Sequence, residues 1–83
     1  MKYSVSCTQV ADGELAAIWI AADDRGAVTN AAQAIERLLA DAPLSHGESR
    51  EPKTRIFFVP PLGVRYLVEP DDLRVVIVQF WTF

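Results

Sequence analysis

The sequence predicts an α+β domain in which a helical hairpin packs on one face of an antiparallel sheet. Residues 2–7 alternate apolar and polar, as in a half-buried strand. Apolar residues then recur with helical spacing to about residue 42, and past Pro43 the period changes back to that of strands. The predicted order is therefore β-α-α-β-β-β, and laying both helices on the sheet buries their apolar stripes.

Composition indicates one compact domain spanning residues 1–83. The chain is 51% hydrophobic and 23% charged, and its one cysteine, Cys7, cannot form an internal disulfide. The longest apolar stretch is far below the roughly 18–20 residues of a membrane span, and the first residues do not resemble a signal peptide. We therefore expect a cytoplasmic protein that does not engage a membrane. Because it lacks nucleotide-loop and zinc-protease motifs, we also expect no cofactor and no metal.

Lys2 to Cys7 is expected to form the first strand, and Thr8 is placed to cap the helix that follows. That helix should run from about residue 9 to 22, because one stripe of it is apolar and carries Leu15, Ile18, Trp19 and Ala22. Within it, Trp19 is expected to anchor the core.

A second helix should begin after Asp23 or Asp24 and end before Pro43. Its apolar stripe consists of Val28, Ala31, Ala32, Ile35, Leu38 and Leu39. Only a few residues separate the two helices, so they should be neighbours in an antiparallel hairpin.

Three strands should follow in a meander: "TRIFFV", "VRYLVE" and "RVVIVQFW". The turn-rich segment "PLSHGESREP" before them is expected to be a loop, with room for a short strand. Alternation places one set of side chains toward the helices: Ile56, Phe58, Val64, Tyr66, Val68, Val76, Val78 and Phe80. The opposite face then carries Arg55, Phe57, Val59, Arg65, Leu67, Ile77, Gln79 and Trp81.

This second face is apolar, bears two arginines and has no helix to cover it. Monomers seldom expose such a patch, so we expect it to meet a partner. Residues 50–65 also hold four of the eight Lys and Arg of a chain whose net charge is -3. A homodimer seam, or a bulge near "PPLG" that reverses the faces, are the alternatives.

Two segments, "AIWIAADDRGAVTNAAQAIERLLADAP" and "GESREPKTRIFFVPPLGVRYLVEPDDLRVVIVQFW", together resemble the RelE/ParE toxins of type II toxin–antitoxin systems, often labelled plasmid stabilisation proteins. The resemblance extends over nearly the whole chain. It implies a helical hairpin on a curved antiparallel sheet, the first strand beside the last, and a cognate antitoxin as partner.

The resemblance also implies an activity. RelE-like toxins inhibit translation by cleaving mRNA at the ribosome, as metal-independent endoribonucleases. Such cleavage needs proton transfer and fixed cations around the reacting phosphate. By position, Lys53 and Arg55 match the family's basic residues entering the sheet, and Arg65 on the neighbouring strand is a further catalytic candidate. Arg50 and Trp81 are candidates for binding RNA or phosphate. The residues expected to meet the antitoxin are Phe57, Leu67, Ile77 and Gln79.

Two other functions fit the sequence. ParE-like toxins target DNA gyrase and need no nuclease chemistry. The acidic composition and the absence of charge after Arg74 favour a third function, a non-catalytic interaction module with the same fold.

Overall fold

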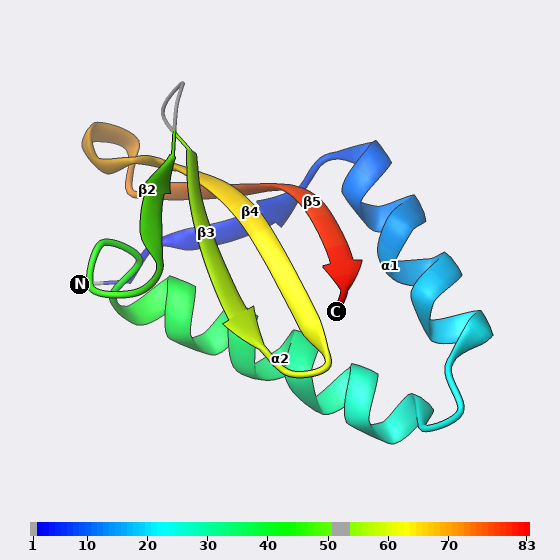
Figure 1. The fold of residues 1–83 in the computed structure, drawn as a ribbon. Helices are drawn as coiled ribbons and strands as arrows, with labels where there is room; N and C mark the ends of the chain where they lie inside the picture. Colours follow the sequence, from blue (N-terminus) through cyan, green and yellow to red (C-terminus); the bar gives the residue numbers. More distant parts are fainter. Residues whose placement is uncertain (1, 51–53) are drawn as a thin grey trace.

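The protein, in a computed structural model, is described for residues 2–50 and 54–83, with the side chain of Arg50 also outside the description. Two helices and five strands follow one another along the chain (Figure 1). Their bounds are β1 Ser4–Cys7, α1 Gln9–Ala21, α2 Arg25–Asp41, β2 Glu48–Arg50, β3 Thr54–Val59, β4 Leu62–Glu69 and β5 Arg74–Thr82, with a short 3₁₀ turn η1 at Pro70–Asp72.

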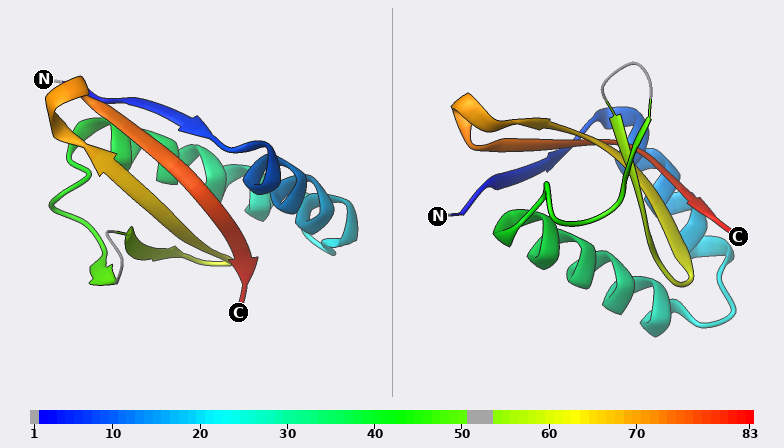
Figure 2. Two further views of the ribbon diagram at one scale, coloured as in Figure 1. Left: turned by 90° about the horizontal axis from the view of Figure 1, so that it is seen from above. Right: turned by 60° about the vertical axis from the view of Figure 1, so that its left-hand side comes forward.

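The five strands form one sheet in the order β1-β5-β4-β3-β2. β1 pairs with β5 in parallel, and the other pairs are antiparallel. The sheet is strongly twisted, and both helices lie on the same side of it (Figure 2). The predicted fold class is thus confirmed, with the first strand beside the last and the short strand β2 in the segment expected to be a loop.

Side-chain caps fix where the two helices begin. The Thr8 hydroxyl accepts a hydrogen bond from the Ala11 amide at 3.1 Å, and Asp24 accepts one from the Ala27 amide at 3.0 Å. Each cap satisfies an amide that has no partner within its helix. Both expected starts are confirmed, and Asp24 rather than Asp23 caps α2. None of the described helices is both long and apolar enough to cross a bilayer.

The core lies between the sheet and the helices. Ile35 and Leu39 of α2 are fully buried and share one core cluster with the buried residues of β4 and β5, which are Leu62, Val64, Tyr66, Val75, Ile77 and Phe80. Each such apolar side chain contributes about 1.5–3 kcal/mol on burial. Trp19 is not part of this core. It is 41% exposed, and its indole N–H donates to the Thr29 hydroxyl at 3.2 Å where α1 and α2 meet.

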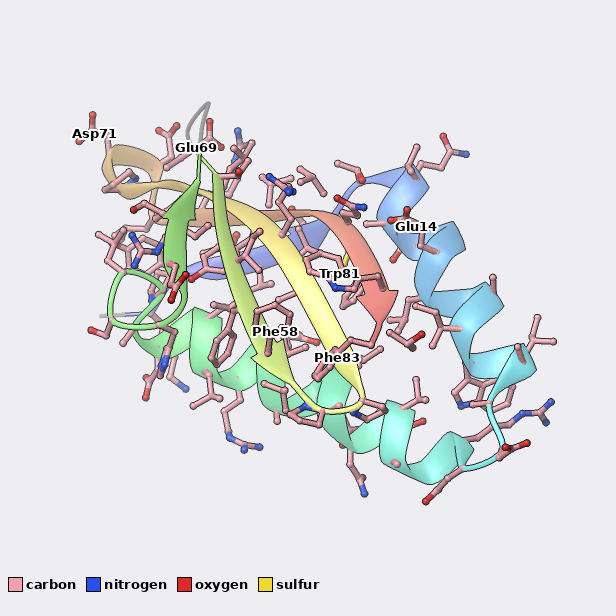
Figure 3. The ribbon with its side chains drawn as sticks, viewed as in Figure 1. Glu14, Phe58, Glu69, Asp71, Trp81 and Phe83 are labelled. Carbon is pink, nitrogen blue, oxygen red and sulfur yellow. The ribbon has the colours of Figure 1, made fainter. Side chains whose placement is uncertain are left out.

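A β-bulge changes the facing of β5. Opposite β4, Arg65 pairs with Gln79 but Tyr66 pairs with Ile77, so Val78 is the extra residue. Val75 and Ile77 before the bulge and Phe80 after it therefore all face the helices. Glu14 of α1 accepts a hydrogen bond from the Phe80 amide at 3.0 Å, which ties α1 to β5 just past the bulge (Figure 3).

The predicted facing of β3 is wrong. Phe58 pairs with Gly63 and Phe57 with Val64 across a turn made by Pro60 and Pro61. Since directly paired residues point to the same side, Phe57 joins the core side with Val64. Phe58 points away and is 51% exposed. The alternative of reversed faces near "PPLG" is thus correct for β3, although the bulge itself lies between β4 and β5.

Candidate functional site: the open face of the sheet

The side of the sheet opposite the helices, here called the open face, is built from three rows of residues that cross the strands. The strand registers give these rows as Thr54, Leu67 and Val76; then Ile56, Arg65 and Gln79; then Phe58, Gly63 and Trp81. Rows are two residues apart along a strand, which is about 6.7 Å.

Three aromatic side chains gather at one end of the open face. The ring of Phe58 meets Trp81 and Phe83 edge-on, with centroid distances of 6.0 and 5.2 Å. Figure 3 shows the three side chains together in front of the ends of β3, β4 and β5. We call Phe58, Trp81 and Phe83 the aromatic cluster. Edge-to-face pairs of this kind contribute about 0.5–1.5 kcal/mol each beyond the area they bury.

Gly63 makes room for this cluster. A Cβ atom at this position would lie 2.5 Å from Trp81 Cε2 and 2.6 Å from Trp81 Nε1. The indole therefore lies flat against the backbone of β4, and only glycine permits that approach. Even so, Phe58 and Phe83 remain 51% and 70% exposed, so their rings present a large apolar surface to solvent.

Arg65 lies in the next row, beside the aromatic cluster. Its Nη1 donates to the Thr54 hydroxyl at 3.1 Å. Thr54 is 7% exposed and immediately follows residue 53, so this contact directs the guanidinium toward the β2–β3 end of the face. An arginine has five N–H donors, and the other donors of Arg65 have no hydrogen-bond partner among the described residues, so they could bind an anionic ligand such as phosphate.

Arg55 does not share this face with Arg65, contrary to the sequence prediction. It pairs with Tyr66 on the helix side of the sheet, under the loop that joins α2 to β2. Its Nε donates to the His46 carbonyl at 3.1 Å and its Nη2 to the Gly47 carbonyl at 3.2 Å. Nη1 donates to the Ser49 hydroxyl at 3.1 Å, and Nη2 also reaches the Leu44 carbonyl at 3.5 Å. The guanidinium is thus occupied by its own chain.

Tyr66 also binds the loop that joins α2 to β2. The phenol is fully buried and its oxygen lies 2.9 Å from the carbonyl oxygens of both Pro43 and His46. Burial raises the pKa of Tyr66 above its ordinary value of 10.0, and the nearby Arg55 guanidinium opposes that rise. The His46 ring packs on Phe57 in a tilted arrangement, with ring centroids 5.1 Å apart. Together these residues build a fixed loop rather than a reactive site.

The four residues expected to meet a partner are divided between the two faces. Leu67 and Gln79 belong to the open face, as predicted from alternation. Phe57 packs on the core side and Ile77 is 2% exposed within the core, so neither belongs to the open face. The Pro60–Pro61 turn sets the facing of Phe57, and the bulge at Val78 sets that of Ile77.

Lys53 lies outside the described residues, and of Arg50 only the backbone is described, at the end of β2 opposite Thr54. Lys53 directly precedes Thr54 in the sequence, and Thr54 is the residue that Arg65 contacts. The candidate site therefore centres on Arg65 and Trp81, with Phe58, Phe83 and Thr54 as members that the sequence reasoning missed. One sequence signal could have found Phe58: a turn of only two prolines pairs it with Gly63.

No protein-family model matches the sequence, and no curated protein sequence matches it significantly. Solved structures do match. The toxin–antitoxin complex RelBE2 from Mycobacterium tuberculosis contains a chain that superposes with a TM-score of 0.84 at 17% identity, with 100% of both chains covered. A chain of the chromosomal ParDE system from P. aeruginosa gives a TM-score of 0.66 at 18% identity, covering 98% of this chain and 96% of that one.

A metal-bound toxin from Helicobacter pylori also matches, with a TM-score of 0.66 at 16% identity over 99% of this chain and 94% of that one. All three are toxins or toxin–antitoxin complexes, and each match extends over nearly the full length of both chains. The protein therefore has the RelE/ParE toxin-like fold.

Proposed function

We propose that the chain is the toxin of a type II toxin–antitoxin module, a cytoplasmic protein kept inactive by a cognate antitoxin. The observation that carries this proposal is the full-length likeness of its fold to chains from two toxin–antitoxin systems. The exposed aromatic cluster beside Arg65 supports the proposal, because soluble monomers seldom expose an apolar surface of this kind unless it binds a partner.

For the activity, we propose cleavage of mRNA at the ribosome, with RNA bound along the open face. Aromatic side chains stack on bases of any sequence, and a neighbouring arginine binds the backbone phosphate. The aromatic cluster and Arg65 lie in adjacent rows about 6.7 Å apart, which is comparable to the spacing of nucleotides in an extended strand. In this proposal, bases stack on Phe58 and Trp81 while Arg65 binds a phosphate.

The chemistry is a transfer within the RNA. The 2′-hydroxyl attacks the adjacent phosphorus, loses its proton to a base, and the 5′-oxygen leaves after receiving a proton. Arg65 would stabilise the extra negative charge on the phosphoryl oxygens. Lys53 is the proposed proton-transfer residue and Arg50 a helper in phosphate binding. Arg55 is assigned no chemical step, because its donors are already bound to the loop.

Gyrase inhibition without cleavage is the second candidate. It is favoured by the net charge of -3 and by the open face, whose described residues include a single guanidinium among mainly apolar side chains. A non-catalytic interaction module would rest on the same observations. Each of these functions would use the aromatic cluster as a protein contact.

Inducing the chain alone in a bacterium tests the proposal. Growth should stop, and Arg65→Ala and Trp81→Ala should each restore growth at equal protein levels. Arg37→Ala, which removes an exposed arginine from α2, is the matched control and should leave the arrest unchanged. Cuts in ribosome-bound mRNA would support the RelE-like activity, and gyrase-linked DNA breaks would support the ParE-like one. A chain that is harmless at high expression would contradict the toxin function.

A further inference from the structure

The hydroxyl of Thr54 is buried in apolar surroundings on the open face. Apart from Tyr66, Thr54 is the only buried residue with a polar side chain in the described part of the chain. Its neighbours in the row across the strands are Leu67 and Val76, which are apolar. A valine has nearly the same shape and no hydroxyl to satisfy, so packing alone would favour valine at this position. The hydroxyl therefore needs a chemical explanation.

Arg65 provides that explanation. The Thr54 hydroxyl accepts a hydrogen bond from Arg65 Nη1 at 3.1 Å. Thr54 pairs with Leu67 on β4, so Arg65, two residues earlier on that strand, is its diagonal neighbour. The Thr54 backbone pairs with Arg50 on one side and Leu67 on the other, and a β-branched side chain has few rotamers. The hydroxyl is thus a fixed point that holds the long arginine side chain.

This contact orients Arg65 without cancelling its charge, because a hydroxyl is neutral. Arg74 shows the contrasting case, in which Nε donates to the Glu69 carboxylate at 2.7 Å and the two charges pair. Arg65 forms no ion pair with any of the residues that the structure describes. Its Nε and Nη2 atoms, which also lack partners among those residues, form one edge of the planar guanidinium and can bind two oxygens of one phosphate.

From this geometry we infer that Thr54 is a positioning residue: its hydroxyl fixes the Arg65 guanidinium so that the Nε–Nη2 edge can bind a phosphate of single-stranded RNA. Without the hydroxyl, the Arg65 side chain would sample several rotamers, and binding would have to order it at a cost in affinity. The identity of the ligand as RNA rests on the proposed function, whereas the ordering of Arg65 by Thr54 does not.

NMR relaxation of the purified protein tests the ordering directly, without a ligand. In the unaltered chain, the order parameter of the Arg65 Nε–H bond should be close to the roughly 0.85 of rigid groups. In Thr54→Val it should fall below about 0.6, the range of flexible groups. Thr54→Ser should keep the high value, because serine retains the hydroxyl. A low value in the unaltered chain, or no change in Thr54→Val, would overturn the inference.

Thr29→Val is the matched control for Thr54→Val. The Thr29 hydroxyl also accepts one hydrogen bond, from the Trp19 indole at 3.2 Å, but it lies on the helix side of the sheet. The same substitution there should leave the Arg65 order parameter unchanged, and an equal loss of order would show that the effect is not specific to Thr54. Circular dichroism and urea unfolding of each variant establish that it is folded.

RNA binding gives the second arm of the test. The probe is a fluorescein-labelled 2′-O-methyl RNA hexamer of mixed sequence, which has no free 2′-hydroxyl to react and so reports binding alone through its anisotropy. Thr54→Val should bind the hexamer about fivefold more weakly, the size expected when a rotamer-rich side chain must be ordered on binding. Thr54→Ser should bind as the unaltered chain does.

A double-mutant cycle establishes whether Thr54 acts through Arg65. In an Arg65→Ala background, Thr54→Val should have no further effect on binding of the hexamer, because the hydroxyl then has no guanidinium to hold. An equal fivefold loss in both backgrounds would mean that Thr54 acts independently of Arg65, and it would overturn the inference.

The two arms separate the positioning role from the proposed function. If the Arg65 order parameter behaves as expected but the unaltered chain does not bind the hexamer, RNA binding on the open face fails while the ordering of Arg65 by Thr54 stands. If the unaltered chain binds the hexamer and Thr54→Val binds it equally well, the positioning role is overturned while RNA binding stands.

Discussion

Arg55 and Arg65 are the same residue type on neighbouring strands, yet the structure gives them opposite surroundings. The Arg55 guanidinium donates to the carbonyls of His46 and Gly47 and to the Ser49 hydroxyl on the helix side of the sheet. Arg65 makes a side-chain hydrogen bond to Thr54 on the open face. The donors of Arg55 are bound to its own chain, whereas Arg65 has donors without a partner among the described residues. A positive charge in the sequence therefore indicates a site only when the fold leaves its donors free.

The largest effect should come from removing the occupied arginine. Arg55→Ala leaves two loop carbonyls without their charged donor, and we expect a loss of about 3 kcal/mol in the free energy of unfolding. In a domain of this size that corresponds to a fall in Tm of more than about 10 °C. Urea unfolding of Arg55→Ala and of Arg55→Lys measures this. The free energy of unfolding of Arg55→Lys should lie between those of the unaltered chain and Arg55→Ala, because a lysine ammonium cannot contact all the acceptors that the planar guanidinium contacts. A change below about 0.5 kcal/mol would contradict the structural role.

The next effect should come from Gly63, which shapes the open face. Gly63→Ala places a methyl group against Trp81, so the indole must move, and we expect destabilisation of about 1–3 kcal/mol. The change should shift the tryptophan emission spectrum. The same substitution in a Trp81→Ala background should cost much less, which a double-mutant cycle measures. Equal costs in the two backgrounds would show that the indole does not pack on Gly63.

The third effect should come from Tyr66, which also binds the α2–β2 loop. Tyr66→Phe removes the hydroxyl that contacts the Pro43 and His46 carbonyls, and we expect a loss of about 1–2 kcal/mol near neutral pH. Because the folded protein raises the pKa of Tyr66, it holds the phenol proton more tightly than the unfolded chain does. That contribution is complete below pH 10.0, the ordinary pKa, and is lost as pH rises through the folded value. When the free energy of unfolding is measured from pH 8 upward, it should therefore fall more steeply with pH for the unaltered chain than for Tyr66→Phe.

The smallest effect on stability should come from Arg65. Arg65→Ala removes a partly exposed hydrogen bond, and we expect a change of about 0.5–1 kcal/mol or less in the free energy of unfolding. Growth arrest should nevertheless disappear. A large loss of stability would place Arg65 with Arg55 as a structural residue and remove the contrast between them.

Some of this molecule is encoded locally. The caps at Thr8 and Asp24 and the alternation of Tyr3, Val5 and Cys7 each depend on neighbouring residues only. These features were predicted because helix and strand periods act over a few residues. The candidate site was predicted in part: Arg65 and Trp81 do lie on the open face, whereas Phe58 was expected in the core. The roles of Lys53 and Arg50 stay predictions.

The sequence by itself determined the element order, the helix starts and the alternation within each strand. Only the tertiary structure decided which face each alternating set occupies, because pairing across the Pro60–Pro61 turn and the bulge at Val78 shift whole strands by one residue. A one-residue shift costs nothing in local pattern but exchanges the two sides of a strand. That exchange is why Arg55 came to hold the α2–β2 loop while Phe58 came to lie beside Trp81 and Arg65.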